Sequence, residues 1–334
     1  TGQTFTINPT TFINNGTLEL TAGTMTLTPS TFSNTAATNI NGGTFNLTPN
    51  STTAPNWSNT GSITLNSGVL NLGGRFGATE LGSFTRTGGT VNLTGIFTNT
   101  GTLNIGGTGL FGAGGLSALN SGTIIGGTLV SDGVVALTSS SGTLNGVTIG
   151  SNLTETGFLQ INNGLTLADG ITVNKGNSQW NFAPGAQSIA MQGGTGSATI
   201  NNAGGTLFAG VGGAGTLTIG NGVTLQGYGQ LTDSSVATIT NNGNIVSNTT
   251  GQTFTINPTT FINNGTLGVT AGTMTISPST FSNTGATNIN GGIFNIAPSS
   301  ATAPNWSNTG SITLNSGVLN LGGRFGATEL GSFT

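Results

Sequence analysis

The sequence predicts an all-β fold, a parallel β-helix in which coils of about 20 residues stack along one axis. Three observations predict it: a short repeat of about this length, a two-residue alternation of apolar and polar side chains, and regular turn positions occupied by Gly, Asn or Pro. A single coil cannot bury its apolar face, whereas stacked coils bury one another's. Because crossover connections between parallel strands are right-handed in nearly all proteins, we expect a right-handed helix.

The first coils show the short repeat most clearly. Residues 4–23 read TFTINPTTFINNGTLELTAG, and residues 24–43 read TMTLTPSTFSNTAATNINGG. The alternation predicts short strands with Phe5, Ile7 and Phe12 turned inward and threonines turned outward. No segment has the spacing and caps of a helix.

A second marker recurs in several coils. It is an aromatic residue, any residue, Asn, a small polar residue and then Gly or Ala, as in FINNG, FSNTA, WSNTG and FTNTG. Asparagines at equivalent positions of stacked coils can hydrogen-bond to one another at strand spacing. We therefore predict a structural asparagine ladder of Asn14, Asn34, Asn59, Asn99, Asn263, Asn283 and Asn308.

A much longer repeat contains the short one. Residues 1–85 align without a gap with residues 250–334, an offset of 249 (250 − 1), and the two copies differ at ten positions between residues 19 and 52. We interpret residues 1–249 as one complete tandem repeat and residues 250–334 as the start of the next, within the same continuous solenoid. We expect the chain to be a window of something longer, with roughly 12 coils per long repeat and an axial rise of ~60 Å at 4.8 Å per coil.

The composition excludes several classes of site. The 334 residues hold only 4 basic and 7 acidic side chains, and they contain neither Cys nor His. Nucleic-acid binding needs clustered Lys and Arg, and thiolate metal sites need Cys, so we expect neither nucleic acid nor a metal or other cofactor. No apolar run is long enough to span a membrane in this segment.

Two irregular segments are candidate contact loops. NSTTAPNW (50–57) lengthens one coil, and GGRFGATELGSFTR (73–86) carries three of the few charges. The alternatives are a tolerated insertion at a turn and a local ion pair on a loop, which is worth little when exposed. The candidate contact residues are Asn50, Pro55, Arg75, Glu80 and Arg86.

Catalysis has little support in the sequence. No His is present to activate a serine, and Lys175 is the only lysine. Asp132 and Glu155 could lie on neighbouring coils as the carboxylate pair of a sugar hydrolase, but the basic residues that usually accompany such acids in a polysaccharide groove are missing. We expect no enzymatic activity, and a carbohydrate-active β-helix remains a minor alternative.

Rows of threonine raise a second minor alternative. TFT, TMT and TFN begin at Thr4, Thr24 and Thr44, and outward Thr rows on a flat solenoid face resemble those of ice-binding proteins. The row ends at Val69, where the equivalent residues read VLN.

The coil sequences FINNGTLELTAGTMTL and FTNTGTLNIGGT resemble those of large bacterial surface adhesins, namely filamentous-haemagglutinin-like proteins and autotransporter passengers with β-strand repeats. This resemblance implies a secreted bacterial protein with an extracellular, cell-surface location. The function it favours is a non-catalytic structural segment of a long β-solenoid fibre that serves as stalk or adhesin. The alternative is a subunit that assembles end to end into an extracellular filament or sheath. The expected partners are the chain itself, through adjacent repeats or neighbouring fibres, and other cells, surfaces or matrix polysaccharide.

Overall fold

The fold is a parallel β-solenoid of about 15 turns, with ~22 residues per turn, in a computed structural model that describes residues 2–334. This confirms the predicted fold class. Residues paired between neighbouring coils are 20 apart at Thr4 and Thr24 and 30 apart at Gln187 and Leu217. The 20-residue coil is therefore the short form, and turns between strands lengthen the others.

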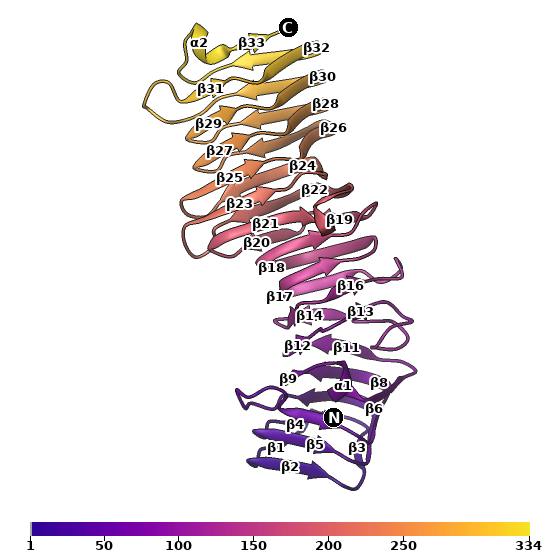
Figure 1. The fold of residues 1–334 in the computed structure, drawn as a ribbon. Coiled ribbons are helices and arrows are strands. Elements are labelled where there is room, and N and C mark those ends of the chain that lie inside the picture. Colours follow the sequence, from indigo (N-terminus) through magenta and orange to yellow (C-terminus); the bar gives the residue numbers. More distant parts are fainter. Residues whose placement is uncertain (1) are drawn as a thin grey trace. The chain divides into compact units, whose positions relative to one another are not determined.

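The chain forms two compact units, the first ending at Gly157 and the second spanning Phe158–Thr334. In each unit successive strands stack in parallel, from indigo to magenta in the first and from pink to yellow in the second (Figure 1). The boundary between the units lies far from residue 250, where the long repeat restarts in the sequence.

The elements of the first unit are β1 (Thr4–Ile7), β2 (Thr11–Asn14), β3 (Leu18–Leu20), β4 (Thr24–Leu27), β5 (Thr31–Asn34), β6 (Ala37–Leu47), β7 (Trp57–Asn59), β8 (Ser62–Leu72), β9 (Arg75–Phe76), α1 (Ala78–Leu81), β10 (Ser83–Arg86), β11 (Thr90–Leu93), β12 (Ile96–Thr98), β13 (Thr102–Asn104), β14 (Ala118–Asn120), β15 (Thr123–Ile125), β16 (Thr128–Val130) and β17 (Leu137–Ile149). The unit boundary falls in β18 (Leu153–Leu167). The elements of the second unit are β19 (Thr172–Gly176), β20 (Gln179–Phe182), β21 (Gly185–Met191), the short 3₁₀ helix Gln192–Gly194, β22 (Ala198–Ala209), β23 (Gly215–Ile219), β24 (Val223–Asp233), β25 (Ala237–Asn241), β26 (Asn244–Ile256), β27 (Thr260–Asn263), β28 (Thr266–Ile276), β29 (Thr280–Asn283), β30 (Ala286–Ile296), β31 (Trp306–Asn308), β32 (Ser311–Leu321), α2 (Ala327–Leu330) and β33 (Ser332–Phe333).

Each regular coil contributes three strand segments, which we call faces A, B and C in chain order. In the first coils of the first unit, face A contains β1, β4 and the second half of β6, face B contains β2, β5 and β7, and face C contains β3 and the first halves of β6 and β8. The pairing is in register, so Thr4 pairs with Thr24 and Thr24 with Thr44. Each side chain therefore stacks on its equivalent in the next coil, as a solenoid requires.

The alternating residues fill the interior. On face A, Phe45 and Leu70 pair with one another and are buried. On face B the rings of Trp57, Phe76 and Phe97 follow in contact, with centroid distances of 4.5 and 5.3 Å. Offset and edge-to-face ring pairs at such distances add to the stabilisation that burial of their area provides.

The first coil is less buried than the sequence predicts. Phe5 is 61% exposed, and Ile7 and Phe12 are half-buried, although all three stand in register with the next coil. The reason is that this coil has a neighbouring coil on one side only within the described residues. The equivalent residues of the second copy, Phe254 and Phe261, are completely buried.

No helix within residues 2–334 has the length and apolarity that crossing a bilayer requires.

Candidate functional site

A ladder of buried asparagines runs along the first unit where face B turns into face C. Nδ2 of Asn14 donates to Oδ1 of Asn34 at 2.6 Å, and Nδ2 of Asn34 donates to Oδ1 of Asn59 at 2.7 Å. The last amide, that of Asn59, donates to the carbonyl oxygen of Leu81 at 2.8 Å. The ladder ends there because α1 occupies the position where the next coil would place an asparagine.

The second unit repeats the ladder with one more member. Asn241, Asn263, Asn283 and Asn308 are joined in order by Nδ2 to Oδ1 bonds of 2.7, 2.6 and 2.7 Å. Asn308 then donates to the carbonyl oxygen of Leu330 at 2.8 Å, at the end of α2. The two ladders thus end in the same way, 249 residues apart (308 − 59).

Sequence reasoning left Asn241 out of the ladder. The marker asked for an aromatic residue two positions before the asparagine, and that position holds Ile239, which is fully buried. The informative signal is an asparagine that shares the inward face of a strand with any large apolar residue, followed by a turn.

Asn99 was predicted to belong to the ladder, and this is wrong. Its Nδ2 donates to the carbonyl oxygen of Thr128 at 3.2 Å, and its Oδ1 accepts the N–H of Gly101. In the strand register, Phe97 pairs with Phe76 on one side and with Ile124 on the other, so Asn99 is opposite Ala78 and Gly126. Neither neighbouring coil supplies an asparagine at that position.

Removal of a ladder amide should cost considerable stability because these amides are buried. Asn34 and Asn263 are fully buried, and Asn34 also donates to the carbonyl oxygen of Ala36 at 2.8 Å, inside the bend. Removal of one internal amide leaves a donor and an acceptor unpaired in the coils on either side, at about 1–3 kcal/mol for each buried group. The ladder therefore ties each coil to both of its neighbours.

Along face A, the outward row of side chains changes from threonine to asparagine, and these asparagines are hydrogen-bonded from coil to coil. Nδ2 of Asn46 donates to Oγ1 of Thr26 at 3.0 Å, Asn71 donates to Asn46 at 2.7 Å, and Asn92 donates to Asn71 at 2.9 Å. These outward groups bond mainly to one another along the stack, so the surface row acts as a further link between coils.

The lengthened coil forms a fixed loop between face A and face B, which we call the loop station (Pro49–Asn56). The buried Asn56 holds it: Nδ2 donates to the carbonyl oxygens of Pro49 and Ser51 at 3.0 and 2.9 Å. Its Oδ1 accepts the N–H of Arg75 in the next coil at 2.7 Å. Asn50 and Pro55, both predicted as contact residues, lie exposed on the resulting loop.

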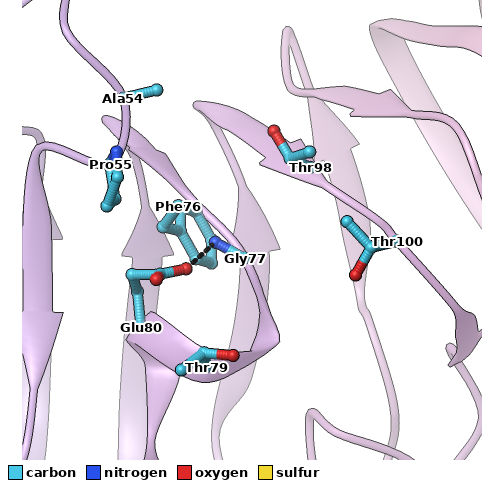
Figure 2. Close-up of a pocket in the computed structure, with 8 residues that line it drawn as sticks. All are labelled: Ala54, Pro55, Phe76, Gly77, Thr79, Glu80, Thr98 and Thr100. Carbon is cyan, nitrogen blue, oxygen red and sulfur yellow. Dashed lines mark hydrogen bonds between the residues drawn. The ribbon is translucent and has the colours of Figure 1, made fainter.

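A recess of about 350 Å³ opens between the loop station and the following coils. Figure 2 shows Phe76 and the carboxylate of Glu80 on one side of it, with Thr98 and Thr100 across from them. Oε2 of Glu80 accepts the N–H of Gly77 at 2.8 Å, which fixes the carboxylate at the recess wall. Apolar and polar groups thus line the recess together, with one negative charge.

The second copy carries the equivalent loop station and recess. Asn305 donates to Pro298 and Ser300 at 3.0 and 2.9 Å, the same distances as in the first copy. A recess of about 380 Å³ lies beside it. Its lining residues are Ala303, Pro304, Arg324, Phe325, Gly326 and Glu329.

The three charged side chains of segment 73–86 make different contacts. Glu80 binds the backbone of Gly77, and Arg75 is half-exposed beside the loop station. Arg86 donates from Nη1 to the carbonyl oxygen of Gly115 at 2.6 Å and from Nε to that of Gly88 at 3.3 Å. Partial burial lowers the pKa of the Arg86 guanidinium. Arg86 therefore supports a neighbouring loop. Arg75 and Glu80 are the charged side chains that remain accessible beside the loop station.

Two of the other acids, Asp132 and Asp233, fix turns. Asp132 accepts the N–H of Gly107 at 2.7 Å, and Asp233 accepts the N–H groups of Ala237 and Thr259 at 2.8 and 2.9 Å. The backbone N–H donors, first among them that of Val134, hold the pKa of the Asp132 carboxyl below its usual 3.8.

Asp132 and Glu155, considered above as a carboxylate pair, have different surroundings. Asp132 is exposed on the turn between β16 and β17, whereas Glu155 is 1% exposed. In the described part of the chain, no three acidic side chains gather as metal ligands would.

Comparison with protein-family models, with curated proteins and with solved structures finds no match to this chain.

Proposed function

We propose that this chain is a structural, non-catalytic segment of a long extracellular β-solenoid fibre, which acts as a cell-surface stalk or adhesin. The observation that carries the proposal is the asparagine ladder, which links consecutive coils within each unit and recurs after 249 residues with the same ending on a short helix. Such a ladder stabilises the in-register stacking of coils, which a long fibre requires.

The distribution of charge supports a structural role. Asp132, Asp169 and Asp233 accept backbone N–H groups of turns, and Glu80 does so at the start of α1. Few charges remain for substrate chemistry, and like charges stacked at strand spacing would repel one another. A low charge is therefore what long, regular stacking favours.

The two loop stations are the surfaces that we propose for contacts. Each offers an exposed loop and a recess with one carboxylate. The two loops differ at Asn50, which is Ser299 in the second copy, and at Thr52, which is Ala301, whereas residues 53–85 and 302–334 are identical. A fibre built from such repeats would present the same contact surface once per repeat, to neighbouring fibres, cells or matrix polysaccharide.

Electron microscopy of the native material, with antibodies against the loop station, tests the proposal. We expect label on thin extracellular fibres. At ~22 residues per turn, 249 residues make about 11 turns, so averaged images of these fibres should show an axial repeat of about 55 Å. Label confined to the cell interior, or to globular particles, would refute the fibre.

The same material distinguishes one long chain from stacked subunits. Denaturing gel electrophoresis of the purified fibres should give a chain several times longer than 334 residues when the fibre is one polypeptide. A single short band from intact fibres would favour end-to-end assembly of subunits.

A further inference from the structure

The only lysine of the chain lies inside the second unit. Lys175 is 0% exposed and sits in β19, where the register against β22 shifts: Asn174 pairs with Asn201, and Gly176 pairs with Asn202. The shift leaves Lys175 as an extra residue, and its side chain turns inward because it continues the alternation that buries Ile171 and Val173. A buried ammonium is costly unless polar groups surround it, so its neighbours indicate what it does.

The amine of Lys175 contacts a buried carboxamide. Nζ donates to Oδ1 of Asn202 at 3.1 Å and to the carbonyl oxygen of Ser178, and it lies 5.9 Å from the ring centre of Trp180. Asn202 is 2% exposed, and its Nδ2 donates to the carbonyl oxygen of Gly205 at 2.9 Å. That bond orients the carboxamide with its oxygen towards the amine.

Gly205 provides the space that the amine occupies. A Cβ at this position would overlap both Nζ of Lys175 and the carbonyl oxygen of Ser178. The amine, the carboxamide and the missing side chain together form one closely packed polar site within the apolar interior.

We propose that Lys175 and Asn202 become joined by an intramolecular amide bond, an isopeptide crosslink between neighbouring coils. Nζ, as the neutral amine, attacks Cγ of Asn202, and a C–N bond forms while the bond between Cγ and Nδ2 breaks. One proton of the amine passes to Nδ2, which leaves as ammonia. Atoms and charge balance without an oxidant, a metal or a cofactor.

The site favours this reaction for two reasons. The two reacting groups are held together, which replaces an encounter in solution with a step inside one molecule. The remaining N–H of the new amide can donate to the carbonyl oxygen of Ser178, which Nζ already contacts. The crosslink would also give a chain without cysteine a covalent tie between coils.

Trypsin digestion of the fully denatured protein, followed by mass spectrometry, tests the proposal. Trypsin cleaves after Arg and after Lys with a free amine, so a crosslinked chain is cut at its three arginines only. We expect an intact fragment of residues 87–324 that is about 17 Da lighter than its sequence, the mass of one ammonia. Cleavage after Lys175 into unmodified fragments 87–175 and 176–324 would overturn the crosslink.

Two variants and a matched control complete the test. Lys175→Met and Asn202→Ala should each abolish the loss of ammonia from this fragment, whereas Asn201→Ala, at the neighbouring outward position, should retain it. The result with the unaltered chain decides the question even where a variant fails to fold. Asn-Gly steps such as Asn264-Gly265 can also lose ammonia by succinimide formation, but hydroxylamine cleaves succinimides, and such a loss would leave Lys175 open to trypsin. A 17 Da loss accompanied by cleavage at Lys175 would therefore contradict the proposal.

Discussion

The coil at residues 4–23 and its second copy at 253–272 have nearly the same sequence but different burial. Their internal geometry is the same: Phe12 stacks on Phe32 with a centroid distance of 5.8 Å, and Phe261 on Phe281 at 5.7 Å. Phe5, however, is 61% exposed, whereas its equivalent Phe254 is 0% exposed. Within residues 2–334, the second copy has a paired strand on both sides and the first copy on one side.

This difference separates two contributions to the fold. The sequence of a coil and one neighbouring coil are enough to set strand register, ring stacking and the asparagine bond. The second neighbour adds the burial of the apolar residues, which supplies most of the stabilising free energy. The same substitution in the two copies should therefore have different effects.

The largest contrast is expected for the core phenylalanine. Phe254→Ala should lower the free energy of unfolding by about 3–5 kcal/mol, because it leaves a cavity between two coils. Phe5→Ala, at a mostly exposed position, should cost less than about 1 kcal/mol. Urea unfolding of the two variants measures the difference, and equal losses would contradict the comparison.

The asparagine ladder gives the next contrast. Asn283 is bonded to asparagines on both sides, whereas Asn14 has an asparagine partner on one side only. Asn283→Ala should cost about 2–4 kcal/mol, since it leaves two buried groups unpaired, and Asn14→Ala about half as much. Urea unfolding measures both losses of stability. Asn→Asp at each site tests whether the Nδ2 donor is required.

A glycine pair offers a test of close approach between coils. A Cβ at Gly265 would lie 2.1 Å from the carbonyl oxygen of Gly243 in the preceding coil, whereas one at Gly16 meets nothing within 4 Å. Gly265→Ala should therefore destabilise by about 1–3 kcal/mol, through strain between backbones. Gly16→Ala should change stability by less than about 0.5 kcal/mol. A shift in thermal midpoint for Gly16→Ala as large as that for Gly265→Ala would count against the stacked arrangement.

The smallest effect is expected from pH. The folded-state pKa of Asp132 lies below its ordinary value of 3.8, so its contribution is present above about pH 4 and is lost as the pH falls through the lower, folded-state value. Asp132→Asn should remove this part of the acid response. The difference between Phe5→Ala and Phe254→Ala should stay constant over the same range, because neither variant removes a titratable group.

The fold could be predicted from the sequence because its signals are local and repeated. Alternating residues such as Phe45 and Leu47 indicate an inward face, and both are buried. The ladder followed for the same reason, since F-x-N places the ring and the amide on one side of a strand. The prediction for Asn99 was wrong because it did not consider which residues the neighbouring coils place opposite this position.

Features that depend on irregular coils could not be predicted. The alternation of Ile171, Val173 and Lys175 places the lysine inward, but no residue pattern marks that β19 and β22 bring its amine to Asn202. The recess beside Glu80 needs the loop station, α1 and the next coil together. Such sites arise from stacking between coils that differ, which a repeat pattern does not describe.

Hydrogen exchange tests the central claim, that a neighbouring coil on both sides is what buries and stabilises each coil. Peptides covering 4–20 and 253–269 differ only at their last two residues, so they have matched intrinsic exchange rates and are still separable by mass. In a protein that consists of these 334 residues alone, we predict exchange at least about tenfold slower in 253–269 than in 4–20. Equal protection of the two peptides would contradict the claim.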